Sequence, residues 1–327
     1  MTITDPTAGS GPGAPTSVPA DGASVVLTEV SKSFGQLVAV SDIDLVIRPG
    51  ITAILGPNGA GKSTLLRLIC GLAKPSTGSV WVAGGDPRFD QEARSHIGLV
   101  PQQDGVFENQ TALETVKLAA TLSGLDQPEE QARRALDTVE LDPELARPVG
   151  TFSKGMRQRV KVAQALVHDP SILVLDEPLN GLDPRQRRHM IELFRRLGEA
   201  GRTVLISSHV LDEVERFGSH IVVVAKGRLV AEGDFREIRT LLDNQPHRLR
   251  IQVKQARQVA AELLRLEAVV GCRIVADDGV EVITNDVRCV RRELLVICQR
   301  LGRTIEALTP LDDNLESVFH YLIGDQP

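Results

Sequence analysis

The sequence lacks the features that define several specialised classes of protein. No apolar stretch approaches the ~18–20 residues that a membrane-spanning helix needs. The first cation is Lys32, so we expect no secretory signal with its positively charged start. The four cysteines, Cys70, Cys272, Cys289 and Cys298, show no C-x-x-C spacing. They indicate free thiols in a reducing cytosol and argue against a metal or disulfide framework.

Basic side chains are fewer than acidic ones, with 37 Lys and Arg against 43 Asp and Glu and a formal net charge of −6. This balance argues against a general nucleic-acid binder, and we expect no nucleic-acid partner. Aromatic residues make up only 3% of the chain, whereas the hydrophobic fraction of 42% is ordinary for a globular protein. The 327 residues are enough for two domains with substantial cores.

One glycine-rich segment has the spacing G-x-x-x-x-G-K-[ST] of a loop that binds nucleotide phosphates. It consists of Gly56, Pro57, Asn58, Gly59, Ala60, Gly61, Lys62, Ser63 and Thr64. Its glycines let successive N–H groups point at one anion, Lys62 reaches the β- and γ-phosphates, and the Ser63 hydroxyl is placed to ligate Mg²⁺. The apolar run 51–55 before it predicts a strand, and the apolar spacing over 65–69 predicts a helix. This strand–loop–helix context disfavours an ordinary Gly-rich turn and predicts nucleoside triphosphate binding.

A second segment places two carboxylates after an aliphatic run. Residues 172–175 read Ile-Leu-Val-Leu, the pattern of a strand buried on both faces, and Asp176 and Glu177 follow directly. At the carboxyl end of such a strand Asp176 would hold Mg²⁺, directly or through water. Glu177 would orient or deprotonate the attacking water. The alternative is an ordinary buried strand that enters an acidic turn.

Between these segments, residues 152–159 read Phe-Ser-Lys-Gly-Met-Arg-Gln-Arg. Here the chain resembles the ATP-binding cassette ATPases, whose signature is usually written L-S-G-G-Q. The family's other motifs follow in its order: Phe34, the phosphate loop, Gln102, the signature, the acidic strand, the D-loop 180–184 and His209. The resemblance covers residues 34–209 and implies an α/β P-loop cassette with a mostly parallel sheet, an antiparallel edge and a helical subdomain.

The resemblance also implies individual roles. Phe34 would stack on adenine, Gln102 would be a Mg²⁺ or water ligand that senses the γ-phosphate, and His209 would contact the γ-phosphate. The implied catalytic residues are Glu177, His209 and Gln102, and the implied metal ligands are Ser63, Gln102 and Asp176. Each of these residues also has an ordinary structural alternative when it is considered alone. Phe34 would more often be a core residue, Gln102 would more often be a loop residue, and His209 would more often be a histidine at the end of a strand.

The signature contributes Ser153, Lys154, Gly155 and Met156 to the implied nucleotide site, and the D-loop contributes Asp183. Three positions depart from the family pattern, since Phe152 replaces leucine, Lys154 the first glycine and Met156 the glutamine. Lys154 either aids anion binding or is a solvated surface residue.

We expect a disordered tail over 1–23, a cassette domain over 24–244 with its helical subdomain at about 90–160, and a small α+β ferredoxin-like domain over 245–327. The order predicted for the last domain is β-α-β-β-α-β. Its predicted elements are strand 249–253, helix 256–266, strands 272–275 and 280–283, helix 287–301 and strand 304–308, followed by a closing helix 314–322. With no catalytic constellation of its own, it is expected to dimerise or contact a partner.

In the resembled family each ATP lies between the phosphate loop of one copy and the signature of another. We therefore expect a second copy or a paralogous cassette subunit, together with separate membrane permease subunits that dock near residues 105–111, for which a solvated loop is the alternative. The predicted function is the ATP-hydrolysing subunit of an export-type transporter, peripheral on the cytoplasmic face of the cell membrane. The alternative is a soluble ATPase that acts on ribosomes or nucleic acid. A non-enzymatic nucleotide sensor would lack the base, yet Glu177 and His209 are present.

Lys62→Ala is expected to abolish tight MgATP binding and turnover, because no neighbouring residue replaces its phosphate-binding charge. The measurement is a titration with a fluorescent ATP analogue, beside a thermal melt that reports folding. Parental affinity in a folded variant would contradict the assignment of the loop.

Overall fold

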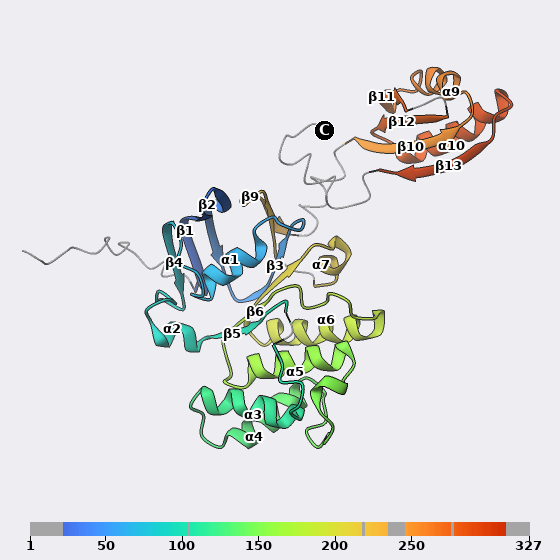
Figure 1. Ribbon diagram of the computed structural model, residues 1–327. Helices are drawn as coiled ribbons and strands as arrows, with labels where there is room; N and C mark the ends of the chain where they lie inside the picture. Colours follow the sequence, from blue (N-terminus) through green and yellow to red (C-terminus); the bar gives the residue numbers. More distant parts are fainter. Residues whose placement is uncertain (1–21, 104, 218–219, 235–245, 276–277, 312–327) are drawn as a thin grey trace, which may run out of the picture.

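The structure, a computed structural model, describes residues 22–103, 105–217, 220–234, 246–275 and 278–311. Within this part of the chain the strands form three sheets (Figure 1). The predicted tail lies outside the described residues except for its last two positions. The four cysteines are unpaired thiols.

The largest sheet has the strand order β5-β6-β7-β3-β8-β9 and is parallel apart from β9, which pairs antiparallel with β8. Its strands are β3 (Gly50–Leu55), β5 (Ile97–Val100), β6 (Ile172–Leu175), β7 (Thr203–Ser208), β8 (His220–Ala225) and β9 (Arg228–Asp234). Every residue of β6 is buried, because alternate side chains enter two different hydrophobic cores. The predicted, mostly parallel sheet with an antiparallel edge is confirmed.

A smaller antiparallel sheet covers one face of this sheet together with helix α1 (Figure 1). Its strands are β1 (Val25–Phe34), β2 (Leu37–Ile47) and β4 (Thr77–Val82), and α1 spans Lys62–Ile69. Leu27, Leu45 and Leu65 share one core with Val174 of β6. Burial, and secondarily the charge of Asp176, raises the pKa of the neighbouring Cys70 thiol to about 12, so this thiol remains protonated.

Helices cover the opposite face of the parallel sheet (Figure 1). They are α3 (Ala112–Leu122), α4 (Pro128–Thr138), the 3₁₀ turn η1 (Val149–Thr151), α5 (Lys154–Leu166), α6 (Pro184–Glu199) and α7 (Leu211–Phe217). The short helix α2 (Gln91–Ser95) lies outside this core and contacts β5. Thr111 begins α3 with a capping box, in which its hydroxyl accepts from Glu114 N and its own N–H donates to the Glu114 carboxylate. The predicted helical region thus contains α2 to α5, together with strand β5.

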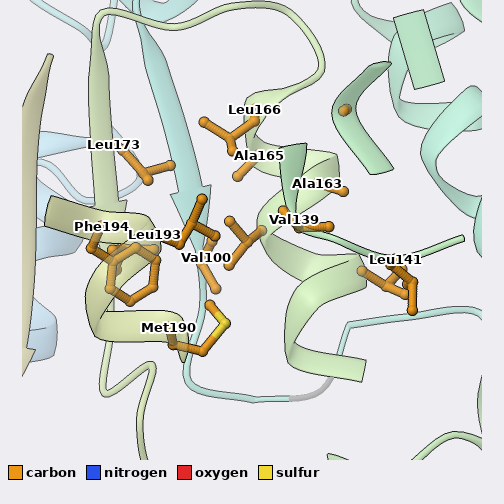
Figure 2. Packing of buried hydrophobic residues seen from close by; sticks show 14 of the residues in the cluster. Val100, Val139, Leu141, Ala163, Ala165, Leu166, Leu173, Met190, Leu193 and Phe194 are labelled. Carbon is orange, nitrogen blue, oxygen red and sulfur yellow. The ribbon is translucent and has the colours of Figure 1, made fainter. Parts of the chain in front are cut away.

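The core under these helices fixes α5 and α6 against the sheet. Figure 2 shows Leu193 and Phe194 of α6 near Leu173 of β6, with Val100 from the end of β5 in the same cluster. Phe194 is fully buried. Burial of a side chain of this size stabilises the fold by roughly 1.5–3 kcal/mol, so the two helices are held firmly where they begin, at the signature and the D-loop.

The C-terminal elements run β-α-β-β-α-β, as the sequence predicts. They are β10 (His247–Val253), α9 (Ala256–Leu263), β11 (Val269–Ile274), β12 (Gly279–Thr284), α10 (Val287–Arg300) and β13 (Ile305–Pro310). Their antiparallel sheet has the order β11-β12-β10-β13 and its own hydrophobic core. The ferredoxin-like assignment and the domain boundaries remain predictions, and the closing helix predicted over 314–322 lies outside the described residues.

A chain that ends at Asn244 is expected to fold and to bind ATP with parental affinity, because the C-terminal segment has a core of its own. Nucleotide titration and thermal melting test both points. Loss of nucleotide binding in a soluble, folded product would show that the segment after residue 244 belongs to the cassette core.

Candidate functional site

The phosphate loop connects β3 to α1 and needs glycine at two of its positions. A Cβ on Gly56 would overlap the carbonyl oxygen of Val224, and one on Gly61 would overlap that of Ala39. Gly61 also has φ 103°, a backbone conformation that other residues rarely adopt. Neighbouring backbone therefore packs directly against the loop and holds it in a single conformation.

Lys62 is the first residue of α1, and only 6% of it is exposed. Its Nζ donates to the carbonyl oxygens of Gly56 (2.7 Å) and Pro57 (3.2 Å) and lies 3.2 Å from Glu177 Oε1. The loop thus curls around the ammonium and buries it. A loss of stability must therefore be separated from a loss of binding in any Lys62 variant.

The two acidic side chains after β6 have different surroundings. Asp176 Oδ1 accepts hydrogen bonds from Ser63 Oγ (3.1 Å) and Ser207 Oγ (2.7 Å). The Glu177 carboxylate lies between Lys62 and His209, whose Nδ1 is 2.8 Å from Glu177 Oε2. The Glu177 side chain is only 7% exposed, and its backbone has φ 49°, a strained value for a residue with a side chain. Tertiary contacts therefore hold Glu177 in place.

Ser207 is a member of this site that sequence reasoning did not select. Its hydroxyl donates to Asp176 Oδ1 and accepts from the backbone N–H of Glu177 at 2.8 Å. Leu175 of β6 pairs with Ile206 of β7, so Asp176 and Ser207, the next residues of the two segments, lie side by side. The only signal in the sequence is a hydroxyl residue two places before the predicted histidine.

A cavity of about 510 Å³ brings together four distant segments of the chain. It is lined by Phe34, residues 37–39, the loop 57–64, Gln102 and Glu177. Phe34 is 53% exposed at the cavity edge, and Lys32 Nζ lies over one face of its ring, 4.8 Å from the centroid. The structure thus unites the residues that the sequence assigned to adenine, phosphate and water.

The signature and the D-loop residue do not line this cavity. Ser153 begins α5, with its hydroxyl accepting from Met156 N, and Asp183 begins α6 by accepting from Arg185 N and Gln186 N. Figure 1 shows both helices under the parallel sheet. Within one chain, the predicted nucleotide-binding residues therefore form two separate groups.

Two signature positions contact the D-loop region of the same chain. A Cβ on Gly155 would overlap the Gln186 side chain, and one on Gly181 would overlap Lys154 Nζ. Gly155 therefore packs against the end of the Gln186 side chain, and the exposed Lys154 extends along Gly181.

Oxygen donors gather beside the loop in a way that suits a hard cation. Ser63 Oγ and Asp176 Oδ1 are 3.1 Å apart, and Gln102 lines the same cavity. Hydroxyl, carboxylate and amide oxygens are the ligands that Mg²⁺ accepts, usually together with phosphates. In the described residues no group of three or more His, Cys, Asp and Glu side chains could hold a metal. The donor set fits magnesium held jointly with a nucleotide.

A parallel sheet, a phosphate loop leading into a helix and carboxylates at the same sheet edge define a P-loop nucleotide-binding domain. Residues 40–180 match the family model described as "ABC transporter". The chain is 36% identical over 216 residues to the Nod factor export ATP-binding protein I of Cupriavidus metallidurans, which covers 65% of this chain and 71% of the relative. It is 33% identical over 293 residues to the daunorubicin/doxorubicin resistance ATP-binding protein of Streptomyces peucetius, covering 88% of both chains.

A solved dimeric ATP-binding cassette in a post-hydrolysis state, bound to ADP and Pi, is similar in structure. Its TM-score is 0.59 at 30% identity, over 65% of this chain and 99% of that one. The chain belongs to the ABC transporter family. It is an ATP-binding subunit and an ATPase coupled to transport. These relatives favour the predicted transporter subunit over the alternative, a soluble ATPase that acts on ribosomes or nucleic acid. Over the ranges that the structure describes, no helix has the length and apolar character to cross a bilayer.

Ser207→Ala is expected to lower kcat about tenfold, because a lost hydrogen bond is worth roughly 1 kcal/mol and both the Asp176 carboxylate and the Glu177 backbone N–H lose a fixed partner. Affinity for ATP without magnesium should not change. Thr203→Val is the matched control, since it removes a buried hydroxyl from the other end of β7. Equal kcat losses in the two variants would show that the Ser207 hydroxyl has no special role.

Proposed function

We propose that this subunit hydrolyses MgATP at a composite site closed by a second cassette. The observation that carries the proposal is the Glu177 carboxylate, held between Lys62 and His209 in the cavity that the phosphate loop lines. The signature residues lie outside that cavity. A second copy or a paralogous cassette subunit would supply them, as the separation of the two groups requires.

The binding roles follow from the geometry of the cavity. Phe34 offers an open ring face for adenine, and the loop N–H groups and Lys62 bind the phosphates. Ser63, Asp176 and Gln102 would hold Mg²⁺, which when bound neutralises charge on the β- and γ-phosphate oxygens. Phosphates compete with Glu177 for the Lys62 ammonium, so nucleotide binding frees the Glu177 carboxylate for the reaction.

The freed carboxylate is the general base. Glu177 accepts a proton as a water oxygen bonds to the γ-phosphorus and the bond to the ADP oxygen breaks. His209 bonds to the other carboxylate oxygen, which orients Glu177, and would contact the γ-phosphate of bound ATP. Burial of Glu177 and its backbone contact with Ser207 keep the carboxylate in one position.

Transport requires partners, and we propose separate membrane permease subunits that place this chain on the cytoplasmic face of the membrane. Export is the proposed direction, supported by relatives whose names state Nod factor export and drug resistance. Lys154 and Met156 in the signature would face the nucleotide bound by the other cassette.

Glu177→Gln is expected to cut ATP hydrolysis by at least ~10²-fold while ATP still binds, because the amide keeps the size of the side chain and loses the base. The variant should also dimerise more readily in MgATP. Turnover assays and light scattering with and without MgATP measure these two effects.

Glu232→Gln is the matched control, because Glu232 also pairs with a histidine, His220, but at an exposed position on β9. It should keep parental turnover. Unchanged turnover in Glu177→Gln would show that another residue is the base.

A further inference from the structure

A second buried lysine lies outside the phosphate loop. Lys161 is on α5 and is only 5% exposed. Its Nζ donates to the carbonyl oxygens of Pro101 (3.0 Å) and Gln103 (3.3 Å). These two residues flank Gln102 on either side, so the ammonium bonds to the peptide units that determine where Gln102 lies.

The other end of this loop is fixed by the sheet. Val100, the last residue of β5, pairs with Leu175, and its carbonyl oxygen accepts from Asp176 N at 2.9 Å. The segment 101–103 therefore leaves the sheet beside Asp176 and is then held by Lys161. Among the residues that the structure describes, none hydrogen-bonds to the Gln102 side chain, which lines the nucleotide cavity. Its position consequently depends on its backbone, and Lys161 bonds to that backbone on both sides.

Burial of a lysine in this place needs an explanation. The side chain is 5% exposed, and an ammonium loses much of its hydration when it is buried to this extent. Two charge-assisted bonds to carbonyl oxygens offset part of that loss. An aliphatic side chain would fill the site without this cost and would leave both carbonyl groups without these bonds.

We propose that Lys161 is a positioning residue that sets Gln102 for magnesium and the attacking water. The proposal rests on the function proposed above for Gln102. Lys161 touches neither nucleotide nor metal and acts through the carbonyl groups of residues 101 and 103. The signature helix thereby holds the loop that carries Gln102 in the same chain.

The first test measures the loop itself, with no nucleotide present. Lys161→Met should speed amide hydrogen exchange at residues 102–103 about tenfold, because the loss of one to two hydrogen bonds lowers the local opening free energy by roughly 1–2 kcal/mol. Exchange in β6 should not change. Lys117→Met, which removes an exposed lysine paired with Glu129, is the control and should leave the loop unaffected. Unchanged exchange at 102–103 in Lys161→Met would overturn the proposal.

The second test measures ATP affinity with Mg²⁺ and with EDTA. Lys161→Met should bind ATP about tenfold more weakly than the parent in Mg²⁺ and equally well in EDTA. Lys161→Arg, which keeps the N–H donors, should retain most of the parental affinity in Mg²⁺. In a Gln102→Ala background, Lys161→Met should have no further effect. Additive losses, or equal losses in EDTA, would show a merely structural role.

The two tests separate the two claims. A normal Mg²⁺ effect in Gln102→Ala would overturn the role of Gln102, while the exchange result would still decide whether Lys161 holds the loop. If Lys161→Met does not fold, Lys161→Gln carries both measurements, because its shorter, neutral side chain removes the ammonium and still places a polar group in the site.

Discussion

The burial of two adjacent carboxylates at the end of β6 is the constraint on which the rest of the site depends. A buried carboxylate is costly unless it is paired and hydrogen-bonded. Asp176 meets this requirement with two serine hydroxyls, and Glu177 meets it with Lys62 and His209. These partners come from α1, from β7 and from the turn after β7. In the central sheet β7 lies beside β6, and β3, which leads to α1, lies beside β7. The strand order therefore brings these partners to the two carboxylates.

The same arrangement explains why nucleotide can control the chemistry. Lys62 bonds to two carbonyl groups of its own loop and to Glu177. Phosphate oxygens are stronger acceptors for an ammonium than neutral carbonyl groups are. In the proposed mechanism, arrival of ATP would change the partner of the Glu177 carboxylate, while the strained backbone at Glu177 is fixed by Ser207.

The three residues that depart from the family's signature pattern do not line the nucleotide cavity of this chain. Their effect would fall on the contact between two cassettes. Phe152 is buried in the helical core, where it replaces one hydrophobic residue by another. Met156 and Lys154 remain at the start of α5, and Lys154 lies along the D-loop glycine of its own chain. A second cassette that closes on this surface would meet a cation where the usual pattern has glycine. Lys154 would thus affect closure by a second cassette, because it lies away from the phosphate loop of its own chain.

Local sequence determined the elements and the order of the motifs. The glycine spacing of 56–61 specifies a curled loop, and the aliphatic run 172–175 specifies a strand buried on both faces, because both depend on near neighbours. The joint order of Phe34, Gln102 and His209 was enough to predict that they share a site, and the cavity contains the first two, with His209 bonded to its Glu177.

Only the tertiary structure decided how these elements support one another. Three contacts depend on strand register and helix packing. Lys62 is buried against its own loop, Ser207 bonds to Asp176, and Lys161 bonds to the loop that carries Gln102. Ser207 meets Asp176 because Leu175 pairs with Ile206, and Lys161 meets Pro101 because α5 packs beside β5. A hydroxyl or an ammonium has no periodicity of its own in the sequence, so its partner becomes defined only when the sheet and helices fix the distance between distant segments.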